Sequence, residues 1–99
     1  MLDNRYFFPK VLQVFPSDDY KVYAYFNDGS IHCKDIKPLI QIDSVFWPLE
    51  NKEVFLSSIT VMNNTVAWDI KNNRDPYSCI DLDVEALFEC PEAVDPLKL

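Results

Sequence analysis

The sequence predicts an α+β fold: a small antiparallel sheet of two hairpins plus a first strand, with two short helices. Short segments of alternating apolar residues are separated by turn residues, which is typical of antiparallel strands. Aromatic residues make up 14% of the chain and, like β-branched residues, favour strands. Two segments behind capping residues instead show helical spacing. A length of 99 residues fits a single domain, 1–99.

The first three strands are expected at 11–15, 20–26 and 31–34. Turn residues close the first of them, and Asp28-Gly29 predicts a two-residue hairpin loop between the other two, because both positions tolerate a positive φ.

This loop predicts a register in which Phe26 faces Ile31 and Tyr25 faces His32. Because strand side chains alternate between faces, one side is then apolar and the other amphipathic. The amphipathic face is expected to carry Lys21, Tyr23, Tyr25, His32 and Lys34.

The middle of the chain is expected to leave the sheet at 35–40 and to form a connection at 41–48. Asn51 then predicts a capped short helix that ends near Ser57. A second hairpin follows, with strands at 59–62 and 65–68 around Asn63-Asn64. Its expected pairs are Val61 with Val66 and Ile59 with Trp68.

The last helix is expected from 84 to about 90, with Asp83 as its cap. Its apolar residues share one stripe and its glutamates another. Pro91 is expected to end the helix, and 91–99 to form a mobile tail.

Charge is concentrated near the carboxyl end. The net charge is −7, yet residues 1–74 hold nine acids and eight bases. The remaining acids, with no lysine or arginine among them before Lys98, are Asp75, Asp81, Asp83, Glu85, Glu89, Glu92 and Asp95. Scattered bases disfavour direct binding of nucleic acid or of an anionic membrane, whereas the acidic segment favours a basic protein partner.

Nothing in the sequence indicates an enzyme, a metal site or a cofactor. His32 and Cys33 are adjacent on one strand and therefore point to opposite faces. The histidine and the three cysteines lack the paired spacing of zinc ligands. Asp81 begins a stretch similar to a calcium loop, but Ala86 stands where the sharp turn needs glycine.

Two binding surfaces remain as candidates, each with a plainer alternative. The first is the face with Tyr23, Tyr25 and His32, which the protein's own helix could instead cover. The second is the acidic segment, which could instead be a solvated surface. Its candidate residues are Asp81, Asp83, Glu85, Glu89 and Glu92. A small-ligand pocket walled by Trp47 or Trp68 is the alternative function.

The three cysteines are an odd number and no signal peptide opens the chain, so we expect free thiols and a cytoplasmic protein. No stretch is apolar enough to span a membrane. The edges of a small sheet are compatible with a homodimer.

The order of these segments resembles a small bacterial family, domain of unknown function 2442, over residues 9–90. The similar features are the valine-rich first strand, the Asp28-Gly29 hairpin, Asp35-Ile36-Lys37-Pro38-Leu39, Phe46-Trp47-Pro48-Leu49, Trp68 and the ending Asp81-Leu82-Asp83-Val84-Glu85-Ala86-Leu87-Phe88. The segment between Trp68 and Asp81 is longer than in that family. The resemblance implies an α+β domain that serves as the antitoxin of a toxin–antitoxin pair. No catalytic residues are established for that family, so the resemblance assigns none to this chain.

Overall fold

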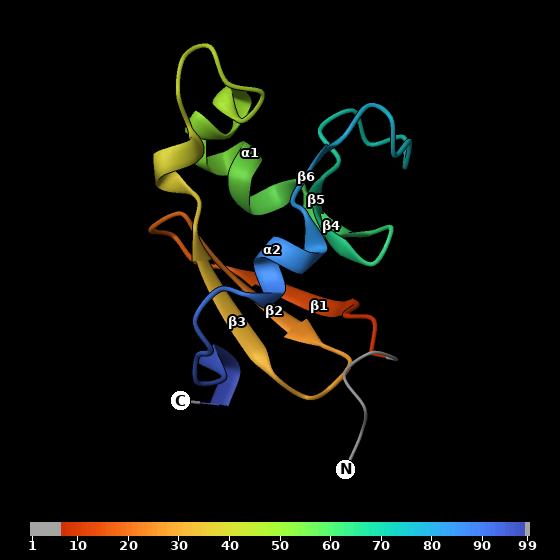
Figure 1. Ribbon diagram of the computed structural model, residues 1–99. Coiled ribbons are helices and arrows are strands. Elements are labelled where there is room, and N and C mark those ends of the chain that lie inside the picture. The colour runs from red at the N-terminus through yellow and green to blue at the C-terminus, as the bar shows by residue number, and fades with distance from the viewer. Residues whose placement is uncertain (1–6, 99) are drawn as a thin grey trace.

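The computed structural model describes residues 7–98 and has two three-stranded antiparallel sheets (Figure 1). The first has the order β1-β2-β3, from β1 (Val11–Pro16), β2 (Lys21–Phe26) and β3 (Ile31–Asp35). The second has the order β4-β5-β6, from β4 (Ile59–Met62), β5 (Thr65–Trp68) and β6 (Ile80–Asp81). The predicted α+β class is confirmed, but the strands divide between two sheets, and the sequence did not predict β6.

Two helices lie where capping residues predicted them: α1 (Lys52–Ser57) and α2 (Val84–Phe88). The Asn51 side chain accepts hydrogen bonds from two amides of the first turn of α1, and the Asp83 side chain accepts one from Glu85 N. Helix α2 ends two residues before the predicted end. Short 3-10 turns at Lys37–Leu39 and Trp47–Glu50 lead into α1.

The second hairpin has the predicted register. Ile59 pairs with Trp68 and Val61 with Val66. The loop residues Asn63 and Asn64 have φ values of 52° and 65°, so both adopt the left-handed conformation that a two-residue loop of this kind requires.

The predicted register of the first hairpin is wrong by one residue. Tyr25 pairs with Ile31 and Ala24 with His32. The loop has three residues, because Phe26 N donates to Ser30 O at 2.9 Å and Gly29 N donates to Phe26 O at 3.0 Å. Gly29, with φ of 88°, supplies the left-handed position that ends such a loop. The shift turns His32 into the core and Ile31 outward.

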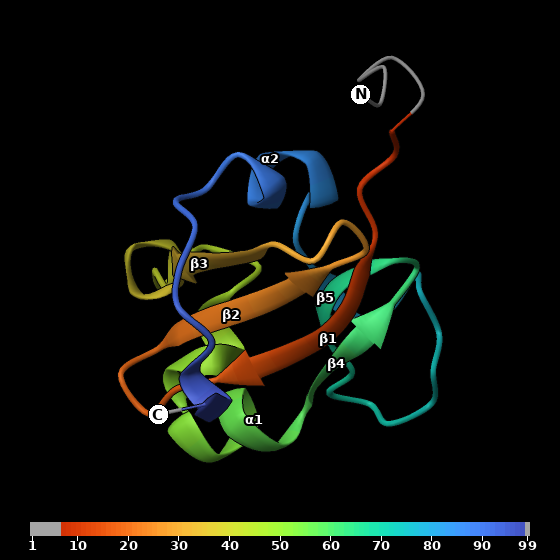
Figure 2. The ribbon, with the colours of Figure 1, turned by 90° about the horizontal axis from the view of Figure 1, so that it is seen from below.

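The core lies between the first sheet and the layer formed by the second sheet and the two helices (Figures 1 and 2). Its largest fully buried side chains are Trp68, Phe55, Ile36, Leu49, Leu87, Val22 and Val66. The opposite face of the first sheet carries the C-terminal segment, which crosses β3 and β2 in Figure 2.

That segment, predicted as a mobile tail, is hydrogen-bonded to the edge of β3. Cys33 N donates to Pro91 O at 3.0 Å, and Ala93 N donates to Ile31 O at 2.8 Å. A short turn at Pro96–Lys98 follows. Residue 99 lies outside the described residues.

Candidate functional site

The acidic residues predicted for partner binding lie along one stretch of chain, here called the acidic strip, that leads from β6 through α2 to the edge of β3. Asp81 lies on β6, and Asp83 caps the start of α2. Glu85 lies in the first turn of α2 and Glu89 is the residue that caps its end. The backbone of Glu92 pairs with that of His32 in an isolated antiparallel β-bridge at the edge of β3. All five side chains are exposed. The carboxylate of Asp83 is occupied by its hydrogen bond to Glu85 N at 3.1 Å, so it serves the helix as well.

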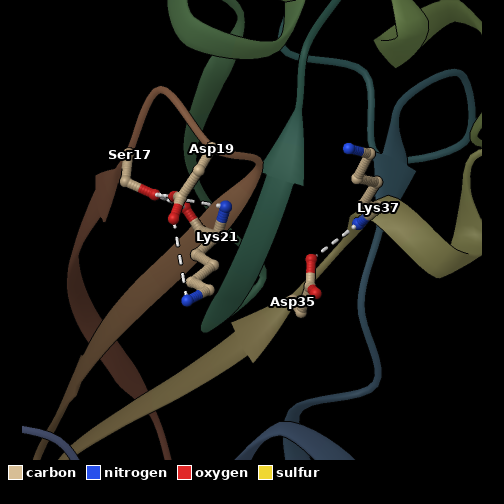
Figure 3. Close-up of polar contacts among 5 residues, drawn as sticks. All are labelled: Ser17, Asp19, Lys21, Asp35 and Lys37. Carbon is tan, nitrogen blue, oxygen red and sulfur yellow. Dashed lines mark hydrogen bonds and ion pairs between the residues drawn. The ribbon is translucent and has the colours of Figure 1, made fainter.

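These carboxylates have no cationic partner within the described part of the chain. The ion pair there joins Lys21 Nζ and Asp19 at 3.6 Å, and a hydroxyl of Ser17 also bonds to Asp19 (Figure 3). Lys21 begins β2, so this pair lies at the opposite end of the strand from the Asp28 turn. Glu85 and Glu89 are four residues apart, so their negative charges repel each other. A positively charged ligand would reduce this repulsion.

A hollow of about 470 Å³ lies beside α2 and contains two of the predicted acids. It is lined by Phe7, Phe8, Pro9, Asp28, Glu85, Phe88 and Glu89. Phe88 of α2 also lines it, and sequence reasoning missed the other four residues, which come from the N-terminal segment and the first hairpin loop. The aromatic run before the first strand was the available signal, but only the tertiary structure brings it beside α2.

Asn27 holds the N-terminal wall of this hollow in place. Its side chain accepts a hydrogen bond from Lys10 N at 3.0 Å and donates one to Phe8 O at 3.2 Å. Its backbone N–H donates to Lys10 O at 3.0 Å. Three hydrogen bonds therefore attach residues 8–10 to the hairpin loop that carries Asp28.

His32 is a core residue and cannot be the exposed partner residue that the sequence predicted. It is 6% exposed, and its ring packs against Phe26 and Phe88 at centroid distances of 5.2 and 4.8 Å. Its Nδ1 donates to Cys90 O at 2.7 Å, and its Nε2 lies 3.0 Å from Ser30 Oγ. Both ring nitrogens are thus satisfied inside the protein.

Ser30 and His32 bring a hydroxyl beside an imidazole, the pairing that a nucleophile and its base would need. The Ser30 hydroxyl, however, also lies 2.5 Å from Asp28 Oδ1, and Ser30 N donates to the same oxygen at 2.9 Å. Burial alone would raise the pKa of Asp28, but these two hydrogen bonds outweigh it and lower that pKa. The serine therefore holds a carboxylate, and the buried histidine offers no approach to a substrate.

The tyrosine face is partly covered by the protein's own C-terminal segment rather than by a helix. Tyr25 donates its hydroxyl to Asp95 Oδ1 at 2.5 Å. Burial and this bond raise the pKa of Tyr25 to about 12. Burial, together with the neighbouring Cys33, raises the pKa of Tyr23, which borders a hollow of about 270 Å³ with Val94 and other tail residues. Only parts of this face remain open to a partner.

The two tryptophans of the predicted ligand pocket lie in different environments. Trp68 is fully buried, and its Nε1 donates to Phe55 O at 3.1 Å, so it is a core residue. Trp47 is 40% exposed and borders a hollow of about 280 Å³ with Tyr20, Lys37, Ile40 and Glu50. The predicted pocket is therefore not formed by both tryptophans together.

A polar hollow of about 460 Å³ lies at the far end of the second sheet and includes Asp69 and Arg74. Asp69 accepts hydrogen bonds from Asn73 N and Arg74 N, and Arg74 donates to Thr60 Oγ1 at 3.3 Å. These bonds order the loop after β5. Within residues 7–98, no group of three metal-ligating side chains comes together, and no helix is long and apolar enough to cross a membrane.

No protein-family model, no curated protein and no solved structure matches this chain. The resemblance to the 2442 family consequently stays a prediction that rests on the quoted motifs.

Proposed function

We propose that this domain is a non-catalytic protein-binding module that captures a basic partner protein through the carboxylates of residues 81–92. By the resemblance described above, it acts as the antitoxin of a toxin–antitoxin pair. The observation that carries the proposal is the exposed strip of carboxylates that lacks a cationic partner in the described chain. Such a strip attracts a basic surface and speeds its approach.

The environment of the reactive side chains supports a role without catalysis. His32 is buried with both nitrogens engaged, and burial raises the pKa of the Cys33 and Cys79 thiols. A thiol with a raised pKa is a poorer nucleophile at neutral pH. The three free cysteines favour a reducing compartment, so we propose a cytoplasmic location.

Reversal of charge on α2 tests this proposal. The tagged chain is co-expressed with the product of the adjacent gene, and the amount of that product that co-purifies is measured. We expect Glu85→Lys with Glu89→Lys to abolish capture, and capture by the unchanged chain to weaken as salt rises. The control is Glu50→Lys with Glu53→Lys, which makes the same change in net charge at exposed positions near α1.

The comparison of these two variants separates location from total charge. If both lose the partner equally, net charge alone governs binding, and the acidic strip is not the site. If neither variant loses the partner, Glu85 and Glu89 take no part in binding, and the proposed mechanism of capture is wrong.

A further inference from the structure

The hollow beside α2 combines aromatic walls with carboxylates from two separate elements. We propose that it is a docking site for an arginine side chain of the basic partner, an inference that rests on the proposed function. Its volume of about 470 Å³ lies within the range of about 300–1,000 Å³ that is common for binding pockets.

The apolar wall is formed before any ligand arrives. Phe88 packs against Phe7 at 5.4 Å, Phe26 at 5.0 Å and His32 at 4.8 Å between ring centroids, so its ring is held from several sides. Phe8 is 71% exposed, although the hydrogen bonds of Asn27 hold its backbone. The packed ring of Phe88 therefore offers aromatic surface to a ligand with little further cost of ordering, and the exposed ring of Phe8 lies beside it in the lining.

The carboxylates reach the hollow from two elements. Asp28 comes from the loop between β2 and β3, while Glu85 comes from the first turn of α2 and Glu89 from the residue that caps its end. Two hydrogen bonds from Ser30 fix the Asp28 carboxylate and keep it ionised. Three negative charges at an aromatic hollow oppose the entry of a neutral apolar or an anionic group, since either would leave those charges uncompensated.

Arginine fits this combination better than the other cationic side chain. Its planar guanidinium stacks on aromatic rings and presents several N–H donors in a fixed fork, so it can face phenylalanine rings and carboxylates together. Lysine is a compact, strongly hydrated charge with less to gain from a ring. The expected partner segment therefore carries an exposed arginine.

Titration of the full ¹⁵N-labelled chain with acetyl-arginine-methylamide, followed by NMR, tests the site. Acetyl-citrulline-methylamide is the neutral control of nearly the same shape. We expect the arginine probe, with Kd on the order of millimolar for so small a ligand, to shift the amides of Asp28, Gly29, Glu85, Phe88 and Glu89. The citrulline probe is expected to bind at least about tenfold more weakly.

Two variants and a matched control complete the test. Glu85→Gln with Glu89→Gln should weaken the arginine probe about fivefold or more, and Phe8→Ala about threefold. Glu53→Gln, at an exposed glutamate in the first turn of α1, should leave it unchanged. Because Phe8, Glu85 and Glu89 are largely exposed, these variants are expected to fold.

The outcomes distinguish this inference from the proposed function. Equal shifts with the citrulline probe, or shifts only outside the hollow, would overturn the arginine site. The proposed function would still stand if lysine substitution at Glu85 and Glu89 abolished capture of the partner. Conversely, probe binding in the hollow with capture unaffected by those substitutions would show that the hollow binds a guanidinium group, but it would refute both the proposed function and the assignment of that arginine to the partner.

Discussion

Replacement of His32 by phenylalanine tests whether this residue serves the core, as the structure indicates, or a partner surface. Phenylalanine retains a ring against Phe26 and Phe88. It removes Nδ1, which donates to Cys90 O, and Nε2, which lies 3.0 Å from Ser30 Oγ. A net hydrogen bond contributes about 1 kcal/mol, and an unsatisfied carbonyl in a protected site adds about 1–3 kcal/mol. We therefore expect the free energy of unfolding to fall by at least about 2 kcal/mol.

For a domain of this size, such a loss lowers the melting temperature by about 8–16 °C. Urea unfolding followed by tryptophan fluorescence measures the loss in free energy of unfolding, because Trp68 is fully buried in the folded state. His32→Asn is the companion variant, since its amide can still donate near the position of Nδ1, and it should lose less stability than His32→Phe. Capture of the basic partner at a temperature where both variants are folded should be unchanged.

The reasoning would be refuted if His32→Phe unfolded with the same free energy as the unchanged chain. It would also be refuted if that variant remained stable but lost the partner. The second result would restore His32 to the exposed face that the sequence predicted and would mean that the observed hairpin register is not the one in solution.

Three further predictions concern the cap, the loop and the tail. Asp83→Ala should cost about 1 kcal/mol of stability through loss of its bond to Glu85 N, whereas Asp81→Ala should change stability by less than about 0.5 kcal/mol; chemical denaturation compares them. Gly29→Ala meets no atom within 4 Å, yet at φ of 88° it should cost about 1 kcal/mol, and an equal or higher melting temperature would contradict this. The pKa of Tyr25 is raised from 10.0 to about 12, so its contribution to stability is complete below pH 10 and is lost as the pH rises through 12. Unfolding followed by circular dichroism should therefore show that Tyr25→Phe loses less stability than the unchanged chain over this alkaline range.

Local chemistry was sufficient to predict the elements whose geometry is set by neighbouring residues. Asn51 and Asp83 cap the two helices as predicted, because a cap satisfies amides only a few residues away. The second hairpin has the predicted register because adjacent asparagines at 63 and 64 adopt the positive φ values that a two-residue loop needs.

The first hairpin shows where local chemistry is ambiguous. Asp28-Gly29 suits a two-residue loop, but a glycine can equally end a three-residue loop, and the two differ by one residue of register. The observed register lets His32 bond to Cys90, a residue 58 positions away. A choice that depends on such a distant partner was not visible in the hairpin itself.

The candidate site was predicted only in part. Glu85 and Glu89 were identified from the density of acids near the carboxyl end, but Asp28 and Phe8 were not, because they approach α2 only when the chain folds. Trp68 was assigned to a pocket because an aromatic residue in a strand can face either a cavity or the core. In the structure, Trp68 packs against Phe55 and bonds to its carbonyl oxygen, so Trp68 belongs to the core.

By itself, the sequence determined the α+β class, the helix caps, the second hairpin and the acidity of the last quarter, since each depends on residues close together in the chain. Only the tertiary structure decided the division into two sheets, the inward position of His32, the attachment of the C-terminal segment to β3, and the hollow where the first and last elements meet. These features join residues far apart in the sequence, so their free energy appears only when the whole chain is packed.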